Sequence, residues 1–90
     1  MIETILTIKH EVGLHARPAA EFVKLARTFE SKIMLTNLTR QGKPADAKSI
    51  LGVLQSAVAK DNQVQLQAAG ADAAAAIAAL TELIEKNFGE

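Results

Sequence analysis

The sequence predicts an α+β fold in which helices cover one face of a β-sheet, and three observations lead to this prediction. Residues 63–69 alternate apolar and polar side chains, as a half-buried strand does. Residues 16–28 repeat apolar side chains at helical spacing, and residues 72–88 combine an alanine-rich run with an apolar stripe. The predicted order is strand, helix, strand, strand, helix, strand, helix, which favours two packed layers.

The first predicted element is a strand over residues 2–8. Alternate residues of a strand share one face, and the apolar members of one face here are Ile2, Leu6 and Ile8. Thr4 is the polar exception on that face. Residues 9–14 are predicted to form a loop, in which Gly13 allows a sharp turn.

The second predicted element is a helix over residues 16–28. Pro18 suits the first turn of this helix, because the N–H that proline lacks would have no partner there. The apolar stripe of the helix consists of Ala19, Phe22, Val23 and Ala26.

For the middle of the chain, the sequence predicts two strands and a short helix. The first strand covers residues 32–38, and a turn over residues 40–42 separates it from a short strand over residues 43–46. Because Pro44 cannot donate to a strand ladder, this third strand is expected at an edge of the sheet. A helix over residues 49–58 follows, and its apolar side consists of Ile50, Val53, Leu54 and Ala57.

The last two elements are the alternating strand over residues 63–69 and a final helix. Asp61 and Asn62 indicate a turn before the strand, and Asn is a residue that adopts the left-handed conformation. Asp72 suits the N-cap position of the helix, which is expected to end near Phe88. The apolar stripe of this helix consists of Ile77, Leu80, Ile84 and Phe88.

Composition and charge exclude several classes of function. Ninety residues predict a single domain over residues 1–90. Ten basic and ten acidic residues balance, so no overall positive field attracts nucleic acid or a membrane surface. The chain has no cysteine and only two histidines, which leaves too few ligands for a metal site. No apolar run approaches the roughly 20 residues that span a bilayer, and a cytoplasmic protein is expected.

His15 is the candidate functional residue, because it stands where the first loop meets the first helix. The first turn of a helix has unpaired N–H groups and a partial positive charge, which together favour a bound phosphate. Arg17 adds a planar donor group for phosphoryl oxygens. A neutral histidine ring is a competent nucleophile toward a phosphoryl donor. The alternative is that His15 is an ordinary polar cap and Arg17 a solvated surface residue.

The segment GLHARPAAEFV, residues 13–23, closely resembles the active-site region of HPr, the histidine-containing phosphocarrier family of the phosphoenolpyruvate-dependent sugar phosphotransferase system. The resemblance extends over nearly the whole chain, and it includes KSILGVL at residues 48–54 and Gly-Ala-Asp at residues 70–72. It implies an open-faced β-sandwich, with a four-stranded antiparallel sheet and three helices on one face.

The resemblance also implies a role for each residue of the site. His15 matches the histidine that takes a phosphoryl group from enzyme I and passes it to enzyme IIA domains. Arg17 matches the arginine that stabilises the phosphate, together with the backbone of Ala16 and Arg17. The implied protein is a monomeric carrier and not an enzyme with its own turnover, and it requires no cofactor or metal ion.

Ser49 matches a serine that HPr kinase/phosphorylase phosphorylates in family members of low-GC Gram-positive bacteria. The alternative is a serine that only caps the second helix. The chain is a few residues longer than the common pattern around residues 37–42, which moves Ser49 from its usual register and leaves recognition by that kinase open.

The expected docking surface for partner proteins lies on the first two helices. A small apolar patch bordered by Lys and Arg suits a transient complex with acidic partners, and Lys48 adds to the local positive charge. Leu51 is expected to face outward, whereas Ile50 and Leu54 are four residues apart and are also compatible with the core. The resemblance implies docking at Ala20, Lys24, Arg27, Leu51 and Leu54, and Ile50 is expected to belong to the same surface.

His10 is expected to be a solvent-exposed loop residue.

Two other functions remain as alternatives to sugar transport. One is a regulatory carrier that serves nitrogen control or a dihydroxyacetone kinase. The other is a non-catalytic interaction or nucleic-acid module, which the three phenylalanines and the absence of Tyr and Trp disfavour.

Overall fold

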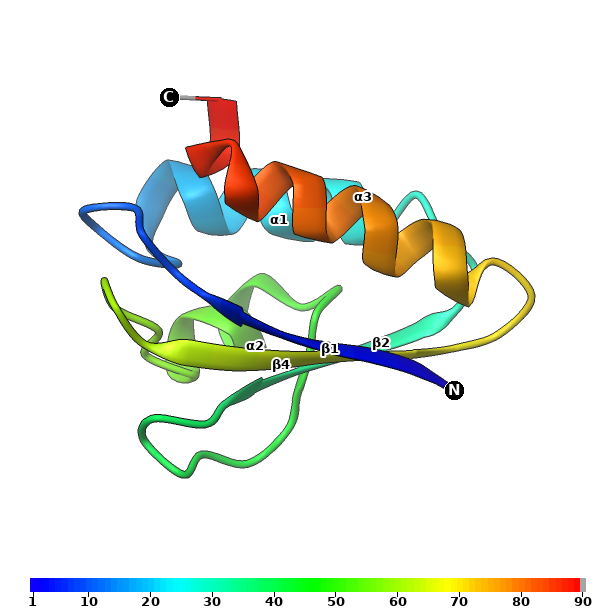
Figure 1. Ribbon diagram of the computed structural model, residues 1–90, viewed down its shortest axis with the longest axis horizontal. Coiled ribbons are helices and arrows are strands. Elements are labelled where there is room, and N and C mark those ends of the chain that lie inside the picture. Colours follow the sequence, from blue (N-terminus) through cyan, green and yellow to red (C-terminus); the bar gives the residue numbers. More distant parts are fainter. Residues whose placement is uncertain (90) are drawn as a thin grey trace.

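A four-stranded antiparallel sheet forms one layer of the molecule, with strand order β1-β4-β2-β3 (Figure 1). The computed structural model describes residues 1–89. Adjacent strands pair in a continuous register, in which Leu66 of β4 lies between Thr4 of β1 and Leu35 of β2. The strands are β1 (Ile2–Thr7), β2 (Lys32–Asn37), β3 (Ala45–Asp46) and β4 (Gln63–Ala69).

Three helices form the second layer and cover one face of the sheet, so the other face is open (Figure 1). This arrangement confirms the predicted α+β open-faced sandwich and its element order. The helices are α1 (Ala16–Ala26), α2 (Ile50–Gln55) and α3 (Ala73–Glu85), and a short 3₁₀ turn, η1 (Asn87–Gly89), follows α3. None of the helices within residues 1–89 has the length and apolar character that crossing a bilayer requires.

The hydrophobic core lies between the two layers. Alternation in β4 is confirmed, because Val64, Leu66 and Ala68 are buried and the three glutamines between and before them are not. The stripe of α1 is buried as predicted, and Pro18 is buried with it. The fully buried large side chains include Ile8, Leu14, Phe22, Ile33, Leu35, Leu66 and Leu80.

Helix α2 is shorter than predicted, and its apolar side faces the core less than the spacing indicates. Only Val53 of this helix is buried, whereas Ile50 and Leu54 are 40% and 36% exposed. The helix ends because Ala57, with φ 54°, adopts the left-handed conformation outside it. Ala57 is itself exposed. Of the four residues on the predicted apolar side, Ile50 and Leu54 are thus exposed, as expected for docking residues, and Ala57 lies outside the helix.

Two turn residues differ from expectation. Asp61 adopts the left-handed conformation with φ 72°, and its neighbour Asn62 does not. The Asn62 side chain instead closes the turn, since its Oδ1 accepts hydrogen bonds from the Ala59 N–H at 2.9 Å and from Asn37 Nδ2 at 3.2 Å.

The last helix also ends earlier than predicted, at Glu85. Phe88 belongs to the separate turn η1, where it has φ 58°, yet it remains 3% exposed and packs on the core. The predicted burial of Phe88 is confirmed, but a turn achieves it and not a continuous helix.

Candidate functional site

His15 occupies the N-cap position of α1, with φ −139° and ψ 158°. Its side chain is exposed and makes no hydrogen bond that caps the helix. The alternative of an ordinary polar cap is therefore not supported. The imidazole lies at the positive end of α1 and is accessible to a partner protein.

Backbone strain lies directly beside His15. Ala16, the first residue of α1, has φ 50°, a conformation that costs a non-glycine residue about 1–2 kcal/mol. Strain of this kind persists only where the surrounding contacts impose it, and it is found at functional sites.

The loop before His15 is held against the segment that follows α2. Leu14 is buried, and its N–H donates to the Val58 carbonyl at 3.0 Å. Gly13 has φ 65°, and a Cβ at this position would lie 2.2 Å from the Val58 oxygen. Only glycine fits this position, so the backbone entering His15 has little freedom.

Arg17 lies two residues after His15, in the first turn of α1, and is exposed. Within residues 1–89 it forms no ion pair, so its guanidinium is available to an anion that approaches His15. The structure thus places an exposed imidazole, the start of a helix and an exposed guanidinium within three consecutive residues.

The residues expected at the docking surface are all exposed. On α1, Lys24 and Arg27 lie on the solvent side, and on α2 Leu51 is 62% exposed. The two helices are packed together, and Arg27 Nε donates to the Lys48 carbonyl at 2.8 Å, just before α2. Lys48 is more restrained than expected, because its Nζ donates to the Phe29 carbonyl at 2.6 Å.

Ser49 is the N-cap of α2, and its Oγ accepts a hydrogen bond from the Gly52 N–H at 3.0 Å. This capping role is the alternative that the sequence left open. The additional residues before it form a turn between β2 and β3, which ends before the backbone that leads into α2. Ser49 therefore keeps a regular helix-start geometry despite the longer turn.

Comparison with known proteins identifies the group to which this arrangement belongs. A family model described as "PTS HPr component phosphorylation site" matches residues 2–86. The chain belongs to the HPr family. HPr proteins are phosphoryl carriers, and not enzymes with their own turnover.

Two kinds of curated relatives match over most of the chain. The phosphocarrier protein HPr of Neisseria meningitidis is 37% identical over 90 residues, which are 100% of this chain and 98% of that protein. The multiphosphoryl transfer protein of Vibrio cholerae is 43% identical over 83 residues, which are 92% of this chain. The chain spans only about a fifth (21%) of the length of that larger protein.

Solved HPr structures share the fold throughout. A crystal structure of HPr from Thermoanaerobacter tengcongensis is 46% identical, with a TM-score of 0.95 over 100% of this chain and 98% of that one. HPr from Bacillus anthracis is 31% identical, with a TM-score of 0.86 over 92% and 95% of the two chains. An HPr dimer from T. tengcongensis is similar to this chain with a TM-score of 0.78, at 46% identity and over the whole of both chains. The monomeric state remains a prediction for the present chain.

His10 is buried, with 8% exposure, so the expectation of a solvent-exposed loop residue is wrong. Its Nδ1 accepts a hydrogen bond from the Val12 N–H at 3.2 Å. Its ring meets the Phe88 ring edge to face, with 5.7 Å between centroids and an angle of 81°. The hydrogen bond between His10 and Val12 has a signal in the sequence, because a polar side chain stands at the start of a turn that ends in Gly13. No local signal indicates Phe88 as a neighbour.

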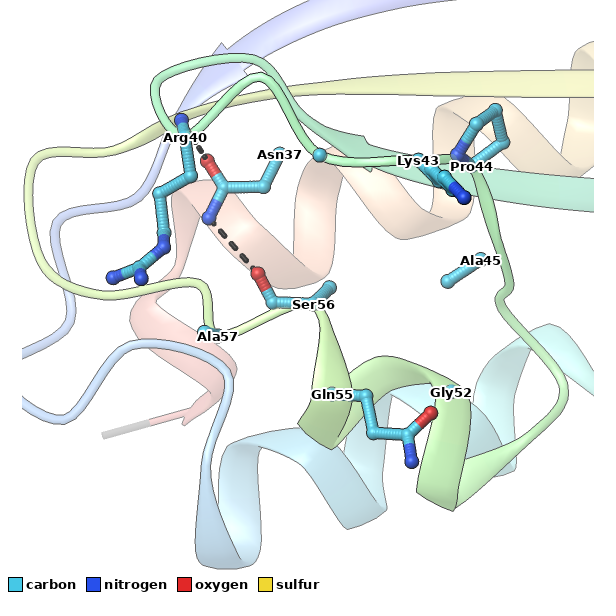
Figure 2. A pocket seen from close by; sticks show the side chains of 10 residues that line it. Asn37, Arg40, Lys43, Pro44, Ala45, Gly52, Gln55, Ser56 and Ala57 are labelled. Carbon is cyan, nitrogen blue, oxygen red and sulfur yellow. Dashed lines mark hydrogen bonds between the residues drawn. The ribbon is translucent and has the colours of Figure 1, made fainter.

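A pocket of about 400 Å³ lies between the β2–β3 turn and the end of α2 (Figure 2), and His15 is not among the residues that line it. Asn37 connects its two walls, because its Nδ2 donates to the Ser56 carbonyl at 3.0 Å and its Oδ1 accepts from the Arg40 N–H at 3.3 Å. The longer turn thus has a structural partner in the segment after α2. Within residues 1–89 no cluster of three or more metal-ligating side chains is present.

Proposed function

We propose that this chain is a cytoplasmic phosphocarrier that accepts a phosphoryl group on His15 from enzyme I and transfers it to enzyme IIA domains. The observation that carries the proposal is the exposed His15 imidazole, which does not cap α1 although it occupies the N-cap position. A histidine side chain that stands at the N-cap position without making a capping hydrogen bond is available for chemistry. Membership of the HPr family supports the same role.

The chemistry requires only an unprotonated ring nitrogen of His15. This nitrogen attacks the phosphorus of the donor, a phosphorus–nitrogen bond forms, and the bond between phosphorus and the donor's leaving group breaks. The backbone of Ala16 and Arg17 begins α1, so the positive end of the helix faces the phosphoryl oxygens. The Arg17 guanidinium adds charge-assisted hydrogen bonds. No cofactor or metal ion takes part on this chain.

Partner proteins are proposed to dock on α1 and α2, beside His15. The exposed apolar residues of α2 supply the centre of the surface, and Lys24 and Arg27 supply a positive border that attracts acidic partners. Ser49 lies at the start of α2, so a phosphate placed there by an HPr kinase/phosphorylase would add negative charge to this surface and weaken docking. The complexes are transient and involve no nucleic acid.

The experiment that tests the carrier role is intact mass measurement after incubation with phosphoenolpyruvate, magnesium and enzyme I. The wild-type chain is expected to gain one acid-labile phosphoryl group, and His15→Ala is expected to gain none while remaining folded. Labelling by a different upstream protein alone would identify a regulatory carrier with the same chemistry. Failure with every donor would reject the phosphocarrier function.

A further inference from the structure

We infer that His10 is a positioning residue for His15, and that it couples the C-terminal turn η1 to the loop of the site. The inference rests on the proposed function, since His15 is there the phosphoryl acceptor. Three sets of contacts carry it: those of His10 with its own turn, those of the turn with the body of the protein, and those of the His10 ring with Phe88.

His10 determines the shape of the turn that follows it. Its Nδ1 accepts from the Val12 N–H at 3.2 Å, and its carbonyl oxygen accepts from the Gly13 N–H at 3.0 Å. A single residue therefore restrains two consecutive amides. Side chains that accept from the backbone two residues on are known to define turns of this kind.

The turn formed by His10 then determines where the backbone enters His15. Gly13 lies against the Val58 carbonyl, and Leu14 is buried and bonded to the same oxygen. Only Leu14 separates the turn from His15, and the strained Ala16 follows directly. With no flexible residue between them, a change in the His10 turn displaces His15, and small displacements of a reacting group reduce rates strongly.

The His10 ring also contacts Phe88, near the C-terminal end of the chain. Phe88 presents its ring at 81° to the imidazole, an edge-to-face geometry that aromatic pairs favour. Phe88 is buried in η1, which contacts α1, and the C-terminal turn lies at the same end of the molecule as the β1–α1 loop (Figure 1). The packing of η1 therefore holds the imidazole in the orientation that accepts from Val12.

Burial and the bond to Val12 distinguish His10 from His15. His15 is exposed and does not cap its helix, whereas the Nδ1 of His10 is already an acceptor within the protein. His10 therefore acts through His15 and does not compete with it for the phosphoryl group.

The test compares His10→Ala, His10→Asn and Phe88→Leu as substrates of enzyme I. His10→Asn keeps an acceptor within reach of the Val12 N–H, and Phe88→Leu keeps apolar bulk without the ring edge. His10→Ala is expected to lower the kcat of His15 phosphorylation about tenfold, with KM unchanged because α1 and α2 are intact. His10→Asn is expected to restore most of the rate, and Phe88→Leu to fall between the two.

A merely structural role would not give this pattern of rescue, and circular dichroism establishes that each variant is folded at the assay temperature. A wild-type kcat in folded His10→Ala, or equal kcat values in His10→Asn and His10→Ala, would overturn the inference. The amide and ring NMR shifts of His15 give an independent readout, expected to move in His10→Ala and to return in His10→Asn. If the wild-type chain takes no label, the proposed function fails, and His15 shifts unaffected by His10→Ala would then reject the positioning role as well.

Discussion

The carboxylate of Asp72 binds Ser31, which lies in the connection between α1 and β2, and does not cap the helix that it precedes. It accepts hydrogen bonds from the Ser31 N–H at 2.9 Å, from the Ser31 hydroxyl, and from the Glu30 N–H at 2.8 Å. Asp72 occupies the expected N-cap position of α3, but its side chain makes no capping bond there. It connects two segments that are far apart in the sequence.

This connection predicts a pH-dependent contribution of Asp72 to stability. The Ser31 hydroxyl, followed by the Glu30 amide, lowers the pKa of Asp72 below its usual value. A carboxyl group with a depressed folded-state pKa stabilises the protein above its unfolded pKa of about 3.9, and this contribution is lost as pH falls through the folded value. Asp72→Asn is therefore expected to lower the melting temperature at neutral pH.

Thermal unfolding at several pH values checks this prediction. The difference in melting temperature between Asp72→Asn and the wild-type chain should be constant near neutral pH and should become smaller below about pH 4. Glu82→Gln is the control, because the exposed Glu82–Lys86 ion pair is of a type worth little. A difference in melting temperature that persists at low pH would contradict the role assigned to the charge.

The close approach of Gly13 to Val58 predicts a large cost for Gly13→Ala. The added Cβ would lie 2.2 Å from the Val58 oxygen and 2.7 Å from the Ala59 Cα, at a φ of 65°. We expect a loss of about 2–3 kcal/mol in the free energy of unfolding, from backbone strain and displaced neighbours. Urea denaturation measures it.

Gly89→Ala is the matched control for this variant. Gly89 has φ 83°, but a Cβ added there would have no neighbouring atom within 4 Å. This variant should lose only the part of the free energy of unfolding that comes from backbone strain, about 1 kcal/mol. Equal losses in the two variants would mean that the contact with Val58 has no energetic role.

The proposed docking surface predicts different effects for two exposed apolar residues. Leu51 on α2 and Ile5 on the open face of the sheet are 62% and 56% exposed. Replacement of either by Ser should change the free energy of unfolding by less than about 0.5 kcal/mol. Only Leu51→Ser should raise the KM for phosphoryl transfer, by about fivefold to thirtyfold, equivalent to 1–2 kcal/mol. A larger effect of Ile5→Ser would place docking on the open face.

Capping and regulation at Ser49 can be separated by two substitutions. Ser49→Ala removes the acceptor for the Gly52 N–H and should reduce stability by about 1 kcal/mol. Ser49→Asp keeps an acceptor and adds negative charge, so we expect near wild-type stability and slower transfer from enzyme I. Denaturation and transfer rates measure the two effects. Unchanged transfer in Ser49→Asp would argue against regulation through charge at this position.

Local patterns in the sequence were sufficient to predict the order of the elements and the buried faces of α1 and β4. The alternation of Val64, Leu66 and Ala68 identifies the buried face of β4, and the spacing of Phe22 and Val23 identifies that of α1. The position of His15 at the start of a helix also follows from local signals. These predictions depend only on residues near one another in the chain.

Strand order, the burial of His10 and the partner of Asp72 were decided by the tertiary structure alone. His10 contacts Phe88 from the opposite end of the chain, and Asp72 meets Ser31 because β4 ends beside the start of β2, where Ala69 pairs with Lys32. Hydrophobic periodicity predicts which face of a helix or strand is buried, but it does not predict which residues pack against that face. The sequence by itself determined the order of the elements, the buried faces of α1 and β4 and the candidate histidine, whereas packing between distant segments decided which polar side chains are buried and to what they bind.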